Sequence, residues 1–206
     1  MNKNLLILGA GQYGTVIKEL AQEIGSFEKV DFLDDTFGLP LTEGNYHEAS
    51  IGKLEDYESF RCDYSYAIAS VEDPTMRSEW TKKLEESGYC VPILVSPHAY
   101  VSPSAQLNRG CVVEPLAGIN ANSIVGIGTF IAMGAVVDHN SFVGDYCNIG
   151  CNAVIMSGAL LSVGEKVNAG EVIRHVPMVF SLEKDGSIHA AKMPITPSEY
   201  SFDDVM

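Results

Sequence analysis

The chain has 206 residues, of which 46% are hydrophobic and 19% charged, as in a globular protein with one ordinary domain plus a smaller one. Its 13 Lys and Arg stand against 27 Asp and Glu, for a formal charge of −14. This balance argues against a nucleic-acid or anionic-membrane partner, because phosphates need a basic surface. No apolar run reaches the roughly 20 residues of a membrane span. Five cysteines without a C-x-x-C pair, and an N-terminus without a signal-peptide layout, predict a cytoplasmic protein and exclude a zinc ribbon or disulfide scaffold.

The first half of the chain alternates between strand-like and helix-like patterns, which predicts a small parallel α/β sheet. The predicted strands are 5–8, 30–33, 66–69 and 91–95, the last at a sheet edge because it contains Pro92. A first helix is predicted to end at Gly25. A second begins at Asp73 and Pro74, presents Met76, Trp80 and Leu84, and ends at Gly88.

A glycine-rich stretch follows the first strand. Gly9, Gly11 and Gly14 have the spacing G-x-G-x-x-G, and Asp34 stands twenty residues after Gly14. In the dinucleotide fingerprint this loop presents backbone N–H groups to a pyrophosphate, and the acidic residue meets a ribose. NAD is the literal interpretation, although nothing downstream indicates hydride transfer. A purely structural turn remains the alternative.

The second half has a period of six. Thirteen positions in succession are aliphatic, namely Val101, Leu107, Val113, Ile119, Val125, Ile131, Val137, Val143, Ile149, Ile155, Leu161, Val167 and Ile173. The residue two positions earlier is small in every case but Glu165 and Glu171. An unbroken repeat of this length predicts a solenoid of short strands, with three hexads in each coil and about four coils.

Details of the repeat lead to further expectations. The small residues are expected to let the chain turn the corners between strands. Glu165 and Glu171 suggest that the regular coils end near them. Cys111 and Cys147 lie two coils apart and are interpreted as small buried hydrophobes on one column.

The pattern [LIV]-x-x-x-[STAC]-x resembles that of the hexapeptide-repeat acyltransferases, whose coils form a left-handed parallel β-helix. With residues 7–14, 32–35, 101–105 and 136–139, the whole chain is similar to the sugar acetyltransferases of the bacillosamine-pathway and sialic-acid O-acetyltransferase type. The resemblance implies a Rossmann-like domain at 1–95 followed by a left-handed β-helix at 96–175. In the remaining segment, 176–206, short alternating runs on either side of Asp185-Gly186 predict a hairpin, and a polar tail follows. The resemblance also implies a homotrimer without a metal.

His139 is the predicted general base. Acyl transfer requires the acceptor to lose a proton, imidazole titrates in the right range, and the family's catalytic histidine matches this position. The alternative is a surface histidine in a turn. Related enzymes often place an acidic residue next, where this chain has Asn140, whose amide can accept from the ring but cannot stabilise its charge. Asp138 or a partner's carboxylate is a possible substitute. Backbone N–H groups of the coils are expected to stabilise the oxyanion.

The resemblance assigns the remaining site residues. The nucleotide part of a nucleotide-linked amino sugar is expected at Gly11, Gln12, Tyr13, Asp34 and Asp35. Some relatives have a histidine where Tyr13 stands. Acetyl-CoA is expected near Asn148 and Gly158. Two interpretations remain open for four nearby cations, which either meet the CoA phosphates or simply dilute an acidic tail: Lys166, Arg174, Lys184 and Lys192.

The predicted function is therefore transfer of an acetyl group from acetyl-CoA to an amino, or less favourably hydroxyl, group of a nucleotide-linked sugar. Two rivals remain. One is a non-catalytic family member that binds a nucleotide sugar or acts as a scaffold, which Asn140 motivates. The other is an acyltransferase for a free acceptor such as serine, sialic acid or another amino acid.

Overall fold

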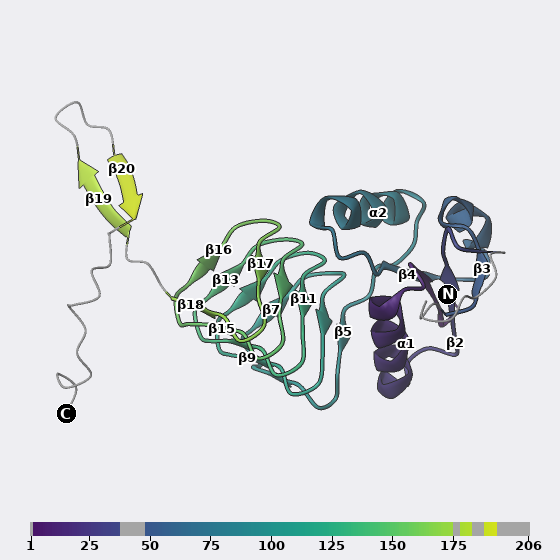
Figure 1. Ribbon diagram of the computed structural model, residues 1–206, viewed down its shortest axis with the longest axis horizontal. Coiled ribbons are helices and arrows are strands. Elements are labelled where there is room, and N and C mark those ends of the chain that lie inside the picture. The colour runs from purple at the N-terminus through teal and green to yellow at the C-terminus, as the bar shows by residue number, and fades with distance from the viewer. Residues whose placement is uncertain (1, 38–47, 175–177, 183–187, 193–206) are drawn as a thin grey trace.

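The computed structural model describes residues 2–37, 48–174, 178–182 and 188–192. Two units follow one another along its long axis: an α/β domain at the N-terminal end and a stack of coils beyond it (Figure 1). The described part of the chain contains no helix that is long and apolar enough to cross a membrane.

The α/β domain is a parallel sheet with helices packed against it. Its strands are β1 (Asn4–Leu8), β2 (Lys29–Leu33), β3 (Ser50–Gly52) and β4 (Tyr66–Ala69), in the order β3-β2-β1-β4. The helices are α1 (Gln12–Ile24), the 3-10 helix η1 (Leu54–Phe60) and α2 (Pro74–Glu86). β1 is almost wholly buried, as its apolar run predicts. This order is that of one half of a Rossmann fold, so the Rossmann-like prediction is confirmed.

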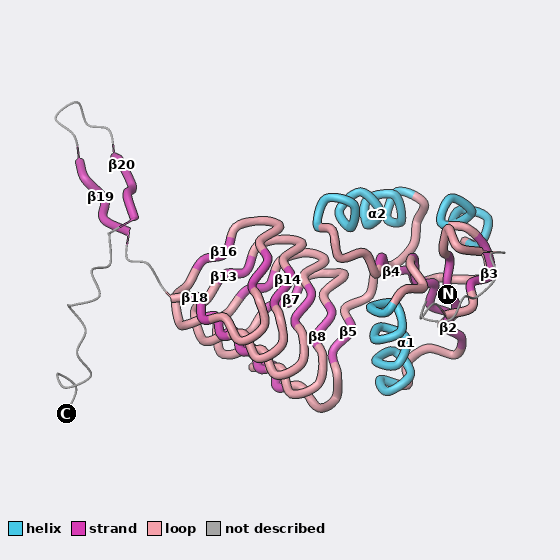
Figure 2. The backbone as a smooth tube through the Cα atoms, viewed as in Figure 1, coloured by secondary structure: helices cyan, strands magenta, loops and turns pink. Residues whose placement is uncertain are grey.

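The coils form a three-sided prism of two-residue strands separated by turns (Figure 2). Face 1 contains β5 (Leu94–Val95), β8 (Val112–Val113), β11 (Phe130–Ile131), β14 (Asn148–Ile149) and β17 (Lys166–Val167). Face 2 contains β6 (Tyr100–Val101), β9 (Gly118–Ile119), β12 (Val136–Val137), β15 (Val154–Ile155) and β18 (Val172–Ile173). Face 3 contains β7 (Gln106–Leu107), β10 (Ile124–Val125), β13 (Phe142–Val143) and β16 (Leu160–Leu161).

All strand pairs within the three faces are parallel and join residues eighteen apart. The aliphatic residues that recur at every sixth position fill the interior together with the small residues. Cys111 and Cys147 are both fully buried there, and burial raises the pKa of the Cys111 thiol to about 12. The arrangement is consistent with a left-handed parallel β-helix, and the predicted fold is confirmed.

One sequence expectation about the strands is wrong. The strand predicted at 91–95 does not belong to the α/β sheet, because β5 pairs with β8 as the first strand of face 1. Among the described residues the coils end at β18, directly after Glu171, although β17 and β18 keep the regular pairing with β14 and β15. The glutamates are tolerated because their side chains are not in the buried interior.

The corners are made by a column of left-handed residues that the sequence reasoning overlooked. Every sixth residue from 110 to 170 has a positive φ: Gly110, Leu116, Asn122, Gly128, Gly134, Asn140, Tyr146, Asn152, Gly158, Gly164 and Gly170. Glycine and asparagine tolerate this conformation best. The small residue that follows each position from Gly110 to Gly158 is buried in the core, so it fills space and does not itself make the turn; Glu165 and Glu171 follow the last two positions.

The α/β domain is attached to the β-helix at the corner between faces 3 and 1, which we call the clamp corner (residues 108–111, 126–129 and 144–147). Arg77 of α2 reaches into it and donates to the carbonyl oxygens of Gly128 at 2.8 Å and Tyr146 at 2.7 Å. Glu85 of α2 pairs with Arg109 in the same corner. The helix therefore lies along this edge of the coils.

A predicted hairpin follows the last coil. β19 (Met178–Leu182) and β20 (Ile188–Lys192) pair antiparallel, as the alternating runs around the Asp-Gly turn predict. The turn itself, Lys184, residues 175–177 and the tail 193–206 lie outside the described residues.

Candidate functional site

The glycine-rich loop leads into α1 and leaves the N-terminus of that helix uncapped. Gly11 is the N-cap residue, no side chain bonds to the first turn, and the turn contains no acidic residue. α2 differs, because Asp73 accepts from the backbone N–H of Met76 at 2.8 Å and Pro74 occupies its first turn. Within the described residues no N-cap side chain bonds to this end of α1, which therefore presents its positive dipole end to an anion.

The three glycines of the loop have different physical roles. A Cβ on Gly9 would lie 2.5 Å from the Ser70 hydroxyl, and one on Gly14 would lie 2.2 Å from the Gly9 carbonyl oxygen. A Cβ on Gly11 would meet nothing within 4 Å. Packing within the protein therefore demands Gly9 and Gly14, whereas the space beside Gly11 is open for a ligand to approach the backbone.

The two aspartates at the end of β2 also differ. Asp34 accepts from the backbone N–H of Ala10 at 2.7 Å and, through its other oxygen, from Thr36. It thereby holds the glycine-rich loop in place. Asp35 and Gln12 are exposed beside the loop. The structure brings together the five predicted nucleotide-site residues at one edge of the sheet, but gives Asp34 a loop-bracing contact that the sequence did not reveal.

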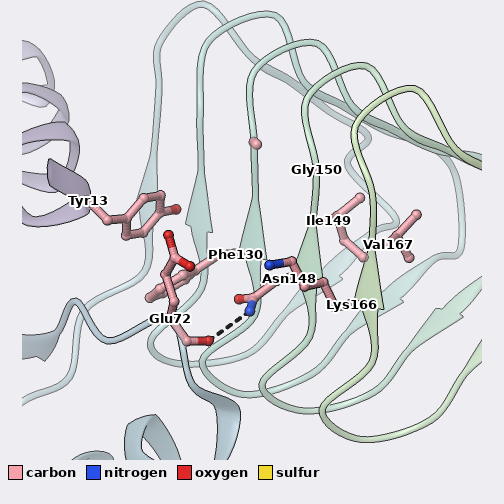
Figure 3. Close-up of a pocket in the computed structure, with 9 residues that line it drawn as sticks. Tyr13, Glu72, Phe130, Asn148, Ile149, Gly150, Lys166 and Val167 are labelled. Carbon is pink, nitrogen blue, oxygen red and sulfur yellow. Dashed lines mark hydrogen bonds between the residues drawn. The ribbon is translucent and has the colours of Figure 1, made fainter.

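A cavity of about 130 Å³ lies between the α/β domain and face 1. Tyr13 and Glu72 line it from the domain, and residues of β11, β14 and β17, including Phe130, Asn148 and Lys166, line it from the coils (Figure 3). It is smaller than the roughly 300 Å³ of a typical ligand pocket. It is therefore large enough for a small group of a ligand and not for a nucleotide.

Tyr13 is the most unusual residue of this cavity. Its ring stacks on Phe130 with centroids 4.7 Å apart, and its buried hydroxyl has no hydrogen-bond partner of normal geometry among the described residues. Burial, followed by the nearby Glu114 carboxylate, raises the pKa of Tyr13 well above its ordinary value. Burial also raises the pKa of Glu114, which accepts from the backbone N–H of Met133 at 3.1 Å. The hydroxyl therefore stays protonated and faces the Glu114 carboxyl group.

Arg77 forms the back of the same wall. Its guanidinium donates to the carbonyl oxygen of Glu72 at 3.0 Å and to Oδ1 of Asn148 at 2.8 Å, and it lies 4.0 Å from the centroid of the Phe130 ring. Only 1% of the residue is exposed, and burial lowers its pKa to about 10, so it remains charged at neutral pH. Sequence reasoning missed Arg77 because an arginine beside Met76 on an otherwise polar helix gives no signal of burial.

Asn148 has a structural role in this protomer. Its amide nitrogen donates to the Glu72 carbonyl oxygen at 2.8 Å, and its amide oxygen accepts from Arg77. Both ends of the side chain are therefore used to join the domains. It lies on face 1, away from the corner that holds His139, and the structure does not bring it together with Gly158.

His139 lies at the corner between faces 2 and 3, which we call the His139 corner (residues 120–123, 138–141 and 156–159). Its side chain is exposed, and its Nδ1 lies 2.8 Å from the side-chain amide of Asn140. Asp138 does not support the ring, because its Oδ1 accepts from the backbone N–H of His139 and from Asn120. These bonds lower the pKa of the Asp138 carboxyl, the backbone donor most of all.

The backbone around His139 is occupied by the coil's own hydrogen bonds. The N–H groups of Asp138 and Asn140 donate to carbonyl oxygens of neighbouring coils, and that of Gly158 donates to the His139 carbonyl oxygen at 3.1 Å. Gly158 therefore lies directly beside the predicted base, one coil further on. The N–H groups predicted as oxyanion donors are already paired in one protomer, so this expectation finds no support at this corner.

The predicted cations fall in different places. Lys166 lines the interdomain cavity, whereas Arg174 follows β18 and approaches the Met156 sulfur at 3.9 Å, on the His139 corner. Across the described ranges, no group of three or more His, Cys, Asp or Glu could hold a metal ion.

Comparison with known proteins agrees with this architecture. Residues 4–84 match the PglD N-terminal domain family. The acetyltransferase domain of PglB from Neisseria gonorrhoeae, crystallised with acetyl coenzyme A, is 26% identical, with 84% of this chain and 92% of that chain covered and a TM-score of 0.72. A histidine-to-asparagine mutant of perosamine N-acetyltransferase from Caulobacter crescentus, crystallised with CoA and GDP-perosamine, is 26% identical, with 82% and 81% covered and a TM-score of 0.68.

A third structure, WeeI from Acinetobacter baumannii, is 18% identical over 90% of this chain and 99% of that chain, with a TM-score of 0.61, and shows the shared fold alone. Together these similarities confirm the family resemblance drawn from the sequence. They support a sugar acetyltransferase of the bacillosamine-pathway type with an enzymatic role.

Proposed function

We propose that this protein, a sugar acetyltransferase of the bacillosamine-pathway type, transfers an acetyl group from acetyl-CoA to an amino group of a nucleotide-linked sugar. The proposal rests on two features that occur together in this chain. The first is the uncapped N-terminus of α1, with open space beside Gly11. The second is the exposed His139, whose Nδ1 is hydrogen-bonded to the Asn140 amide. The first suits a pyrophosphate, and the second suits a general base. The similar structures crystallised with acetyl coenzyme A, or with CoA and GDP-perosamine, support both partners.

His139 performs the proton transfer in this proposal. Acetyl-CoA supplies the activated acetyl group as a thioester. As the acceptor nitrogen bonds to the acyl carbon and the C–S bond breaks, His139 Nε2 takes the proton that the nitrogen loses and passes it to the departing thiolate. Asn140, bonded to Nδ1, fixes the orientation of the ring. Gly158 lies beside the base, and Arg174 on the same corner is the cation best placed to meet an anionic group there.

We also propose that the site is shared between copies of the chain in a homotrimer. The His139 corner joins faces 2 and 3. The nucleotide domain and the cavity lie against face 1, which this corner does not touch. One protomer therefore presents its base and its nucleotide loop on different sides. Apolar side chains flank His139 on both adjoining faces, among them Val136, Phe142 and Leu160, with 65% of Leu160 exposed. Packing of a second copy there would cover them and bring the partner's nucleotide loop to His139.

An assay of thiol release from acetyl-CoA tests the reaction. With UDP-, dTDP- or GDP-linked 4-amino sugars as acceptors, we expect turnover by the wild type and a loss of at least about a hundredfold for His139→Ala. His98→Ala is the matched control, because His98 is also exposed but lies on the first coil against Glu23. Binding of the nucleotide sugar without turnover would favour the non-catalytic rival.

Nucleotide dependence separates the main proposal from a free-acceptor enzyme. Gly11→Ala leaves the fold intact because its Cβ would occupy open space, and we expect it to weaken binding of the nucleotide sugar about tenfold or more. Asp35→Ala gives a second probe, whereas Asp34→Ala would also disturb the loop through Ala10. Unchanged acceptor affinity in both Gly11→Ala and Asp35→Ala would favour a free acceptor.

A further inference from the structure

The peptide unit between Gly9 and Ala10 is held on two opposite sides. Its carbonyl oxygen accepts from the Ser70 hydroxyl at 2.7 Å, and its N–H donates to Oδ2 of Asp34 at 2.7 Å. In a trans peptide unit the C=O and N–H groups point in opposite directions, and the unit itself is rigid. Two partners on opposite sides therefore fix the rotation of this unit about the line that joins its two Cα atoms.

The register of the sheet places both partners beside the loop. β1 lies between β2 and β4, and Leu8 at its end pairs with Leu33 on one side and with Ala69 on the other. Asp34 and Ser70 are the residues that directly follow these two partners. Each neighbouring strand therefore supplies one side chain to the first peptide unit of the glycine-rich loop.

This peptide unit sets the direction of the loop that follows it. Gly9 has a φ of 108°, which side chains rarely permit, and a Cβ there would lie 2.5 Å from the Ser70 hydroxyl oxygen. Ala10 then leads to Gly11, the N-cap residue of α1. A rotation of the unit would therefore redirect the backbone N–H groups that this end of the helix presents to an anion.

The simpler explanation of Ser70 is a hydroxyl that supports the end of β4. The sheet does not need it, because the carbonyl oxygen of Leu8 already accepts from the backbone N–H of Ser70 at 2.8 Å, although the hydroxyl also lies 2.9 Å from that oxygen. The shorter contact of the hydroxyl is the one to Gly9, which belongs to the loop. Only 9% of Ser70 is exposed, so its hydroxyl is a buried donor and not a surface group.

From this juxtaposition we propose that Ser70 is a positioning residue for nucleotide binding. With Asp34 on the opposite side, it fixes the peptide unit between Gly9 and Ala10 and so aims the backbone N–H groups of the loop at the pyrophosphate. The inference rests on the proposed function, because it concerns the nucleotide site of that reaction. Since Ser70 acts through the loop, its loss should weaken binding of the nucleotide part and leave the chemical step unchanged.

Ser70→Ala removes the hydroxyl and keeps the backbone N–H that pairs with Leu8. We expect KM for the nucleotide sugar to rise about fivefold, the worth of one hydrogen bond, with kcat and KM for acetyl-CoA unchanged. Kd should rise by the same factor for whichever of UDP, GDP and dTDP the wild type binds most tightly. Thr81→Val is the matched control, because Thr81 also has a buried hydroxyl that donates to a backbone carbonyl, that of Arg77 at 2.7 Å, within α2. It should keep the wild-type affinity.

Hydrogen exchange tests the hold on the loop without a ligand. In the full-length protein we expect the backbone amides of residues 9–12 to exchange about fivefold faster in Ser70→Ala than in the wild type, and Thr81→Val to leave them unchanged. Wild-type exchange in Ser70→Ala would overturn the hold of Ser70 on the loop. Faster exchange together with wild-type affinity for the diphosphate would overturn its role in nucleotide binding. A wild-type protein that binds none of the three diphosphates would instead overturn the nucleotide site of the proposed function, and the role of Ser70 with it.

Discussion

The clamp corner and the His139 corner are built from the same repeat, yet they present opposite surfaces. At the clamp corner a buried guanidinium satisfies the carbonyl oxygens of Gly128 and Tyr146, and α2 covers the edge. At the His139 corner the turn residues carry exposed side chains that bond to one another, and no element within the described residues covers them. The difference shows that a six-residue repeat fixes the backbone while leaving each corner free to attach a domain or to hold a reactive group.

The largest expected effect is obtained by breaking the clamp corner. Arg77→Met removes the donors of several buried carbonyl oxygens, and we expect the free energy of unfolding to fall by about 3–5 kcal/mol in denaturant titrations. Arg109→Ala is the control at the same corner. Its pair with Glu85 is exposed, so its loss should cost no more than about 1 kcal/mol. Equal effects of the two changes would contradict the clamp.

The second prediction concerns the uncovered faces beside the His139 corner. Phe142→Glu or Leu160→Glu places a charge in the proposed contact between copies, and we expect association to weaken by about a hundredfold, measured as molar mass by light scattering. Val163→Glu is the control, because Val163 is as exposed as Leu160 but lies on the edge between faces 3 and 1. A wild-type monomer, or dissociation caused by Val163→Glu alone, would refute the proposed contact.

A smaller effect is expected at Glu114, whose carboxyl group lies close to Tyr13 at the contact between the α/β domain and the β-helix. Burial raises the pKa of Glu114, so between its ordinary value of 4.5 and the raised value the native state binds more protons than the unfolded chain. Stability contributed by this group therefore falls as pH rises through that window. Glu114→Gln should remove this slope and raise the free energy of unfolding at neutral pH, since glutamine can still accept from the backbone N–H of Met133. Denaturation at several pH values would show it, and an unchanged slope would contradict it.

Sequence periodicity predicted the parallel sheet, the β-helix and its inward column, because apolar spacing reports burial directly. The left-handed turn residues were equally visible in the sequence, because most of the positions that recur every six residues from 110 are glycine or asparagine. This backbone requirement explains why an asparagine stands at position 140 without reference to catalysis. Other features had no local signal. Arg77 is buried because a distant corner offers carbonyl oxygens to it, and β5 pairs with β8, eighteen residues away. Such partners follow from the folded arrangement and not from the neighbouring residues.

The candidate site residues also divide into those that a local sequence pattern indicates and those whose contacts form only in the folded chain. The loop at Gly11 and the candidate base His139 were predicted from motif and resemblance, and the catalytic role of His139 stays a prediction. The cavity between Tyr13 and Phe130 was not, since it exists only where the two domains meet. Asn148 could not be recognised as an interdomain contact for the same reason, because its partners Arg77 and Glu72 lie more than seventy residues earlier.

Complementation between two inactive variants tests most directly whether the base and the nucleotide loop come from different protomers. His139→Ala keeps an intact loop, and Gly11→Asp keeps an intact base while placing a carboxylate where phosphates would lie. Differently tagged chains are co-expressed, mixed assemblies are purified through both tags, and thiol release is measured. We expect mixed trimers to recover about a third of the wild-type activity, since one of the three sites in each mixed trimer pairs an intact loop with an intact base. Mixed assemblies as inactive as their parents would contradict the shared site.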